Sequence, residues 1–253
     1  MLTRHLPSTL LLFAGLLAGP VLAAGNLPDF TASYKVSRGA ITIGTARIAL
    51  TREHGGGYHY ESHRWPARLA SLFNKDKVHE TSSGGIDGDT LRPSKYHYLR
   101  TGGERERVAH LTFDWDAGIV VNNVAGSRWK MAIPADTHDK LSTQLGMMAA
   151  LARDRTAFSF NVADGGTLKQ YRYRVVGRES VSVPAGDFAT VKVERTSDND
   201  RRRTWAWCAP ALNYLPVRIV RQEADDAEYS SDLEGFSGAL RSGTGSQPAA
   251  GMP

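Results

Sequence analysis

Apolar and polar residues alternate along most of the chain, which is the pattern of antiparallel strands with one solvated face. Gly, Asp and Asn residues interrupt this alternation at short intervals, as the turns between strands require. The alternating segments are 30–37, 41–51, 58–64, 78–86, 93–101, 105–115, 119–124, 128–133, 158–162, 168–183, 188–195, 203–207, 215–222 and 228–236. They predict a mainly β protein, built as a large curved antiparallel sheet or as a half-open or closed barrel-like sandwich.

Two glycines lie inside predicted strands, where a residue without a side chain weakens the sheet. At Gly44 we expect a bulge or a close approach of two backbones. The segment 168–183 is long, and we expect it to bend or to contain a bulge near Gly177.

One segment has the period of a long helix. Residues 140–153 place Leu141, Leu145, Met148 and Ala152 on one face, and Asp139 precedes them as an N-cap. This predicts one central α-helix packed on the sheet. A shorter helix is predicted at 65–73, begun by Pro66 and carrying Leu69, Leu72 and Phe73 on one side.

The amino terminus has the three parts of a secretory signal peptide. It has a basic start with Arg4, an apolar run over about residues 10–18, and small or short apolar side chains at 21–23, the positions that a signal peptidase recognises. The run is about half of the roughly 20 residues that cross a bilayer. We therefore expect cleavage after Ala23, no later transmembrane segment, and a periplasmic product. Residues 24–237 are expected to form a single β-rich domain, and the tail 238–253, rich in Gly, Ser, Ala and Pro, to be disordered.

The formal charge is +5 and the basic residues are interleaved with acidic ones. Nucleic-acid surfaces are broad and of one sign, so no nucleic-acid partner is expected. The densest basic run, 201–203, lies beside Asp198 and Asp200, as in a solvated turn. Cys208 is the only cysteine, which excludes an intramolecular disulfide and favours a buried small apolar residue.

His59, Glu61 and His63 alternate along one strand and project from one face. Ligands must converge to within about 2 Å of a metal ion, whereas side chains two apart on a flat strand diverge. The pattern therefore favours a solvated outer face, and no metal is predicted. Three further histidines, His79, His97 and His110, are expected at sheet edges or on solvated faces.

Nucleophilic catalysis has little support, because no G-x-S-x-G elbow is present. Ser142 could be activated by His138, but a residue in the first turn of a helix more often satisfies backbone donors. No catalytic residue and no cofactor is predicted.

Aromatic residues offer a better candidate site. Trp205 and Trp207 share a strand face, and a curved sheet needs something in its concavity. The candidate lining for a hydrophobic ligand is Trp205, Trp207, Leu145, Met148, Tyr58 and Tyr60. The alternative is that these side chains fill an ordinary core.

Several short motifs occur together in a characteristic order. They are Tyr34-Lys-Val with Ile43-Gly-Thr45, Asp139-Lys-Leu-Ser142, Val183-Pro-Ala-Gly186 with Phe188-Ala-Thr190, and Thr204-Trp-Ala-Trp207 followed by Leu215-Pro-Val-Arg-Ile219. In these motifs the chain resembles the domain of unknown function 3108 family of bacterial exported proteins. The resemblance implies an antiparallel, β-rich exported domain and brings no activity or catalytic residue.

Three functions remain in order of preference. The first is a non-enzymatic periplasmic binding or carrier domain for a lipid or another hydrophobic or envelope-derived ligand. The alternative is a structural or assembly factor of the cell envelope, which binds an envelope protein through edge strands or the tail. The third is a hydrolase of envelope polymers, which would need Asp136 or Asp139 to act with His138.

Overall fold

The computed structural model describes residues 27–238, apart from 69–70, 72–74, 88–89, 104–105, 125, 199–201, 224 and 226. The predicted signal peptide and the tail beyond Gly238 lie outside the described residues, and so do Leu69, Leu72 and Phe73 of the predicted short helix.

Fifteen strands and one α-helix make up the described chain. They are β1 (Phe30–Arg38), β2 (Ile41–Glu53), β3 (Gly57–Pro66), β4 (Lys77–Asp87), β5 (Thr90–Thr101), β6 (Arg107–Asp114), β7 (Ile119–Val124), β8 (Ser127–Ala132), β9 (Thr137–Asp139), α1 (Ser142–Ala152), β10 (Ala157–Asp164), β11 (Thr167–Val183), β12 (Gly186–Ser197), β13 (Arg203–Ala209), β14 (Leu215–Gln222) and β15 (Glu228–Gly238). A 3-10 turn, Pro210–Leu212, joins β13 to β14.

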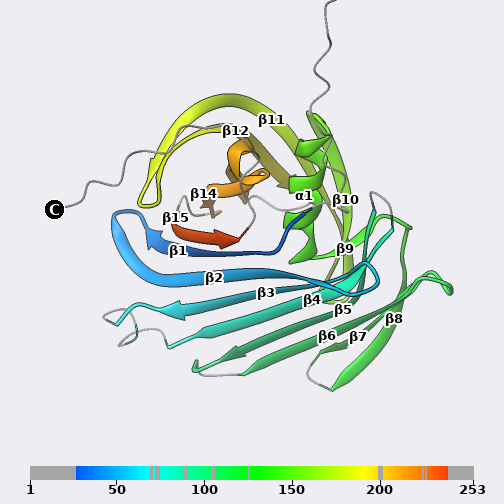
Figure 1. Ribbon diagram of the computed structural model, residues 1–253. Helices are drawn as coiled ribbons and strands as arrows, with labels where there is room; N and C mark the ends of the chain where they lie inside the picture. The colour runs from blue at the N-terminus through cyan, green and yellow to red at the C-terminus, as the bar shows by residue number, and fades with distance from the viewer. Residues whose placement is uncertain are drawn as a thin grey trace, which may run out of the picture.

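All fifteen strands belong to one curved sheet, which confirms the predicted fold class (Figure 1). The order across the sheet is β8 to β1 in reverse, then β15 down to β9, so the first and last strands are neighbours in its middle. The two edges, β8 and β9, are consecutive in the chain. Figure 1 shows β11 and β12 arching over the strands of the first half.

Both glycine predictions are confirmed. The β1–β2 register shifts opposite Gly44, and a Cβ on Gly44 would lie 2.4 Å from the carbonyl oxygen of Trp65. The register of β11 against β12 shifts between Val175 and Gly177. Gly44 therefore allows two backbones to approach, and the shift near Gly177 lets the longest strand bend.

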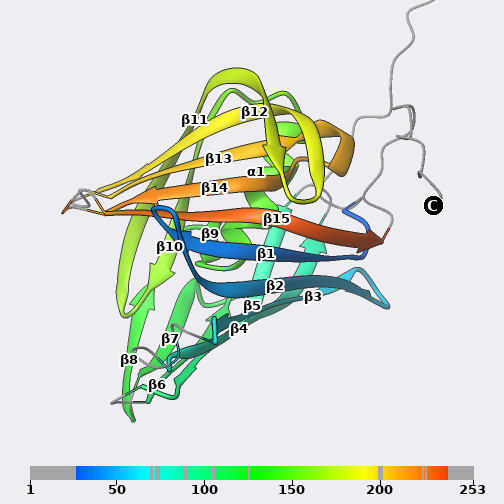
Figure 2. The same cartoon turned by 90° about the vertical axis from the view of Figure 1, so that its left-hand side faces the viewer.

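Helix α1 fills the inside of the curved sheet (Figures 1 and 2). Leu141, Leu145 and Met148 of the predicted apolar face pack in one core cluster, and residues on the other sides of the helix are buried as well. One side packs Leu145 and Met148 against the half that contains β1–β6, and the other packs Met147 and Leu151 against β10–β13. A helix enclosed by its own sheet has no solvated face to keep polar.

The helix begins at Ser142, later than predicted, because the preceding residues are extended. Thr137–Asp139 form β9, which pairs in parallel with Asn161–Ala163 of β10. Asp139 still acts near the helix start: its Oδ1 accepts hydrogen bonds from the backbone nitrogens of Leu141 and Ser142, each at 2.8 Å.

Candidate functional site

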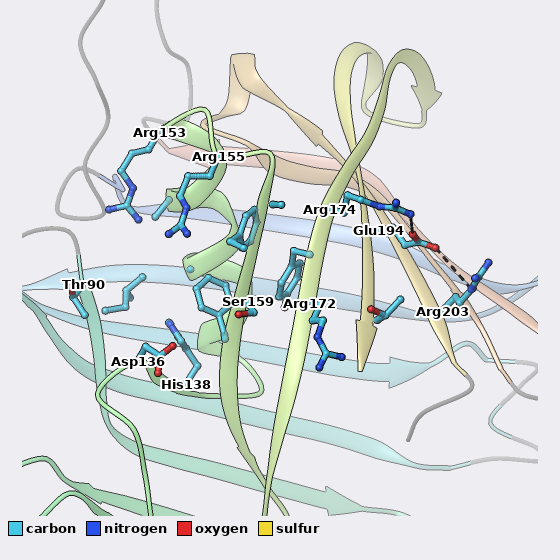
Figure 3. A pocket seen from close by; sticks show the side chains of 18 residues that line it. Thr90, Asp136, His138, Arg153, Arg155, Ser159, Arg172, Arg174, Glu194 and Arg203 are labelled. Carbon is cyan, nitrogen blue, oxygen red and sulfur yellow. Dashed lines mark hydrogen bonds and ion pairs between the residues drawn. The ribbon is translucent and has the colours of Figure 1, made fainter. Parts of the chain in front are cut away.

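The sheet is incomplete beside β10. Strand β9 pairs with only three residues of β10, which leaves Ala157–Phe160 with β11 as their one strand neighbour in the described sheet. A hollow of about 950 Å³ opens here (Figure 3). It is lined by Thr90, Leu91, Asp136, His138, Gly146, Ala149, Arg153, Arg155, Ala157, Phe158, Ser159, Phe160, Arg172, Tyr173, Arg174, Glu194, Thr196 and Arg203.

Four rings form a continuous cluster in this hollow. Phe160 contacts His138, Phe158 and Tyr173, with ring centroids 4.5, 5.6 and 5.5 Å apart. Phe158 is stacked on Tyr173 at 5.1 Å. Gly146 makes room on α1, since a Cβ there would lie 3.0 Å from His138 and 3.1 Å from Phe160. The hollow thus has an apolar surface that can contact a hydrocarbon or a ring.

Five arginines and two carboxylates line the same hollow. Figure 3 shows Arg153 and Arg155 on one side of the strand that carries Ser159, and Arg174, Glu194 and Arg203 on the other. The lining therefore carries an excess of positive charge, which favours an anionic ligand.

The arginines on the second side are held by ion pairs. Arg174 lies 3.0 Å and Arg203 3.9 Å from Glu194, while Arg172 contacts Asp198 at 2.6 Å. On the first side, the guanidinium of Arg155 lies 6.0 Å from the centre of the Phe158 ring. More than half of each of the three side chains Arg172, Arg174 and Arg203 is exposed, so they remain accessible to a ligand.

A buried polar network lies behind the hollow. Ser82 Oγ on β4 donates a hydrogen bond of 2.6 Å to Asp139 Oδ2, and Tyr58 Oη lies 3.1 Å from the same Ser82 oxygen. Asp139 has no exposed surface. Burial raises its pKa to about 6, although hydrogen bonds from Ser82, Ser142 and Leu141 oppose the shift.

Ser142 and His138 do meet, with 3.2 Å between Oγ and Nδ1. Burial lowers the pKa of His138 to about 4, against the charge of Asp136, so its ring is neutral at pH 7. Ser142 Oγ also bonds the backbone nitrogen and oxygen of Asp139 and has no exposed surface. The Asp139 carboxylate accepts hydrogen bonds from Ser82 and from two backbone nitrogens. His138, Asp139 and Ser142 therefore connect the start of α1 to β9. The Ser142 hydroxyl is not accessible to a substrate in this arrangement.

Four of the six predicted groove residues lie in the apolar core. Tyr58, Tyr60, Leu145 and Met148 are fully buried in one core cluster around α1.

Trp205 and Trp207 are partly buried and lie on the face of β13 opposite to Ala206 and Cys208. Trp207 packs against the core cluster that contains Leu145 and Met148. Ala206 and Cys208 point inward. Trp207 is covered by Lys192, 4.5 Å from the ring centre, and donates a hydrogen bond of 2.5 Å to Glu179. The small residues face inward because α1 occupies the space beside them.

The arginine-lined hollow was not predicted from the sequence. Its arginines come from the end of α1, the following turn, β11 and β13, and only the fold brings them together. The spacing of Arg172 and Arg174 was the available signal, because residues two apart in a strand share a face.

A family model described as a protein of unknown function, DUF3108, matches residues 29–233, which confirms the resemblance seen in the sequence motifs. Among curated proteins, none matches the chain. Within the described residues, α1 is neither long nor apolar enough to cross a membrane.

Solved structures with a related shape also exist. A β-barrel-like protein of the DUF1849 family from Brucella abortus matches with a TM-score of 0.59 and 9% identity over 84% of this chain and 98% of its own. A structure assigned to an exported protein with a YmcC-like fold from Bacteroides fragilis gives a TM-score of 0.33 and 10% identity over 84% and 97% of the two chains. The first similarity supports the fold alone.

Proposed function

The chain belongs to the DUF3108 family, and we propose that it is an exported, non-enzymatic binding protein whose hollow beside β10 takes an anionic amphiphile of the cell envelope. The acid group of the ligand would lie on the arginines, and its apolar part would cover Phe158 and Phe160. Location outside the cytoplasm is part of the proposal and rests on the signal-like amino terminus.

The observation that carries the proposal is the combination of five arginines with a cluster of aromatic rings at the place where the sheet is incomplete. Arginine is suited to carboxylate and phosphate groups, because its planar fork donates two parallel hydrogen bonds. The space inside the sheet is taken by α1 and fully buried side chains, so it supports a ligand less well than the hollow does.

A specific observation also favours the alternative, an assembly factor that binds an envelope protein. Residues Ala157–Phe160 of β10 border the hollow and have one strand neighbour in the described sheet. Such an edge can receive an added strand from a partner. We rank this function second, because strand addition makes no use of the arginines.

Two experiments test the proposal: one identifies a ligand that copurifies with the protein, and the other measures the binding of a known lipid. Protein purified from its own periplasm and weighed intact should carry a stoichiometric adduct, and solvent extraction should release an acidic lipid or a related amphiphile. In titration calorimetry at low salt, lysophosphatidylglycerol should bind and zwitterionic lysophosphatidylcholine should bind more weakly. Their difference measures the contribution of the arginines.

Variants locate the site. The double variant Arg153→Gln/Arg155→Gln should weaken lysophosphatidylglycerol at least about tenfold, since two charge-assisted hydrogen bonds are lost. The matched control is Arg178→Gln, an exposed arginine of β11 outside the hollow, which should leave affinity unchanged. Equal loss in both variants, or equal binding of the two lipids, would contradict the proposal. A clean mass with a protein crosslinked at β10 would support the assembly factor instead.

A further inference from the structure

Two histidines and a glutamate meet on the outer face of the first half of the sheet. His63 of β3 lies directly opposite His79 of β4 in the antiparallel register, and Glu61 is two residues before His63. Glu61 Oε1 bonds Nε2 of His63 and also Nε2 of His79, the latter at 2.8 Å. We propose that Glu61, His63 and His79 bind a divalent transition-metal ion, for which Zn²⁺ is the representative.

The strand pattern places all three side chains on the same, accessible face. Tyr60 and Ser62 of β3 point into the core, so their neighbours Glu61 and His63 point outward. About a third of each of the three side chains is exposed, at 32, 34 and 33% for Glu61, His63 and His79. An ion can therefore reach the site from solution.

The geometry agrees with the needs of a metal. The potential ligand atoms of the three residues lie within 4.8 Å of one another, so modest side-chain rotation brings them to the 2.0–2.2 Å that Zn²⁺ requires. The two imidazole rings are stacked, with centroids 4.0 Å apart and planes inclined by 11°. Nε2 of each ring also contacts the same carboxylate oxygen, Glu61 Oε1. Two histidines and one carboxylate form a common ligand set with open positions for water or substrate.

The surroundings hold the site in place. Trp65 is stacked with His63, with centroids 5.3 Å apart and planes inclined by 5°. A second histidine pair, His97 of β5 and His110 of β6, continues across the sheet with centroids 4.4 Å apart. In the cross-strand register His97 lies opposite Thr81, which makes it the diagonal neighbour of His79. We place the ion at His63 and His79, because the carboxylate of Glu61 contacts both of these rings.

This inference is independent of the proposed function, because the site lies on β3 and β4 and shares no residue with the hollow. The site combines residues of two strands. Residues two apart on one strand do diverge, but a partner from the adjacent strand converges on both of them. The cross-strand register that pairs His63 with His79 was not visible in the sequence.

The test titrates tag-free protein with Zn²⁺ by calorimetry, in buffer without other chelators. We expect one ion per chain, and Glu61→Gln, His63→Gln and His79→Gln should each weaken binding at least about tenfold. The matched control is His59→Gln, which removes a histidine from the same strand and the same face but from outside the cluster. The double variant His97→Gln/His110→Gln should also retain the site.

Two further readouts separate binding from folding. The paramagnetic resonance spectrum of bound Cu²⁺ should show coupling to two nitrogens, and Cu²⁺ should quench the fluorescence of Trp65 in the native protein but less in His79→Gln. Circular dichroism in EDTA establishes that each variant is folded. The absence of stoichiometric Zn²⁺ binding by the native protein, or the same loss of affinity in His59→Gln as in His79→Gln, would overturn the assignment.

Discussion

Ser82 and Asp139 are 57 positions apart in the sequence, and the hydroxyl of Ser82 donates a hydrogen bond of 2.6 Å to the carboxylate of Asp139. The bond connects β4, in the first half of the sheet, to the strand that leads into α1. Both side chains are fully buried. The two halves of the chain are therefore joined through a polar contact inside the apolar core.

Replacing Ser82 with Ala should destabilise the protein by about 1–3 kcal/mol, because a buried carboxylate loses a hydrogen-bond donor. The pKa of Asp139 should rise further, since the bond from Ser82 favours the ionised form. Urea unfolding measures the first effect. Ser83→Ala is the control, because Ser83 is the next residue and points to the other face. Equal effects of the two substitutions would contradict this role.

His138 and Asp139 should give the stability opposite dependences on pH. The native pKa of His138 is lowered from 6.5 to about 4, so its contribution is present above pH 6.5 and is lost as pH falls toward 4. The native pKa of Asp139 is raised from 3.8 to about 6, so its contribution is present below pH 4 and is lost as pH rises to 6. The pH-dependent contributions of His138 and Asp139 to the free energy of unfolding therefore largely cancel between pH 4 and 6.

Single variants should expose each dependence. Relative to the native protein, Asp139→Asn should gain stability as pH rises from 4 to 6, and His138→Gln should lose it, by up to about 3 kcal/mol over the range. Asparagine can keep the bonds to Ser82 and to the helix start. The measurement is the free energy of unfolding in urea at pH 4, 5 and 6. Parallel pH profiles for the two variants would contradict the assignment.

Gly44 and Gly177 should respond differently to alanine. A Cβ at Gly44 would lie 2.4 Å from the backbone oxygen of Trp65, whereas at Gly177 nothing lies within 4 Å. Gly44→Ala should therefore destabilise by about 1–3 kcal/mol or more, because the backbone must move. Gly177→Ala should be neutral or stabilise by up to about 1 kcal/mol, through lower entropy of the unfolded chain. Thermal unfolding distinguishes the two, and a larger cost at Gly177 would show that the close approach is not a constraint.

Leu145→Ala should cost about 2–5 kcal/mol, because Leu145 is fully buried where α1 contacts the sheet. Trp205→Ala removes a larger but only partly buried side chain and should cost less. Chemical denaturation compares the two directly. If Trp205→Ala were the more damaging, the inward direction of Ala206 and Cys208 would be in doubt.

The sequence by itself determined the fold class, most strand limits and the irregularities at Gly44 and Gly177. These features depend on local chemistry: the period of two between apolar residues, the turn residues, and the freedom of a residue without a side chain. The inward side of β13 was not decided locally, because Trp205 and Trp207 alternate with Ala206 and Cys208 and all four are apolar or small. The packing of α1 against β13 determined that Ala206 and Cys208 face the helix.

Only the tertiary structure decided which residues meet. The register of β3 against β4 places His79 beside Glu61 and His63, and the sheet order brings five arginines from separate segments around one hollow. Neither arrangement follows from a local period, because the register and neighbours of a strand are set by the packing of the whole sheet around α1. The side chains of both candidate sites were visible in the sequence, and the fold alone supplied their partners.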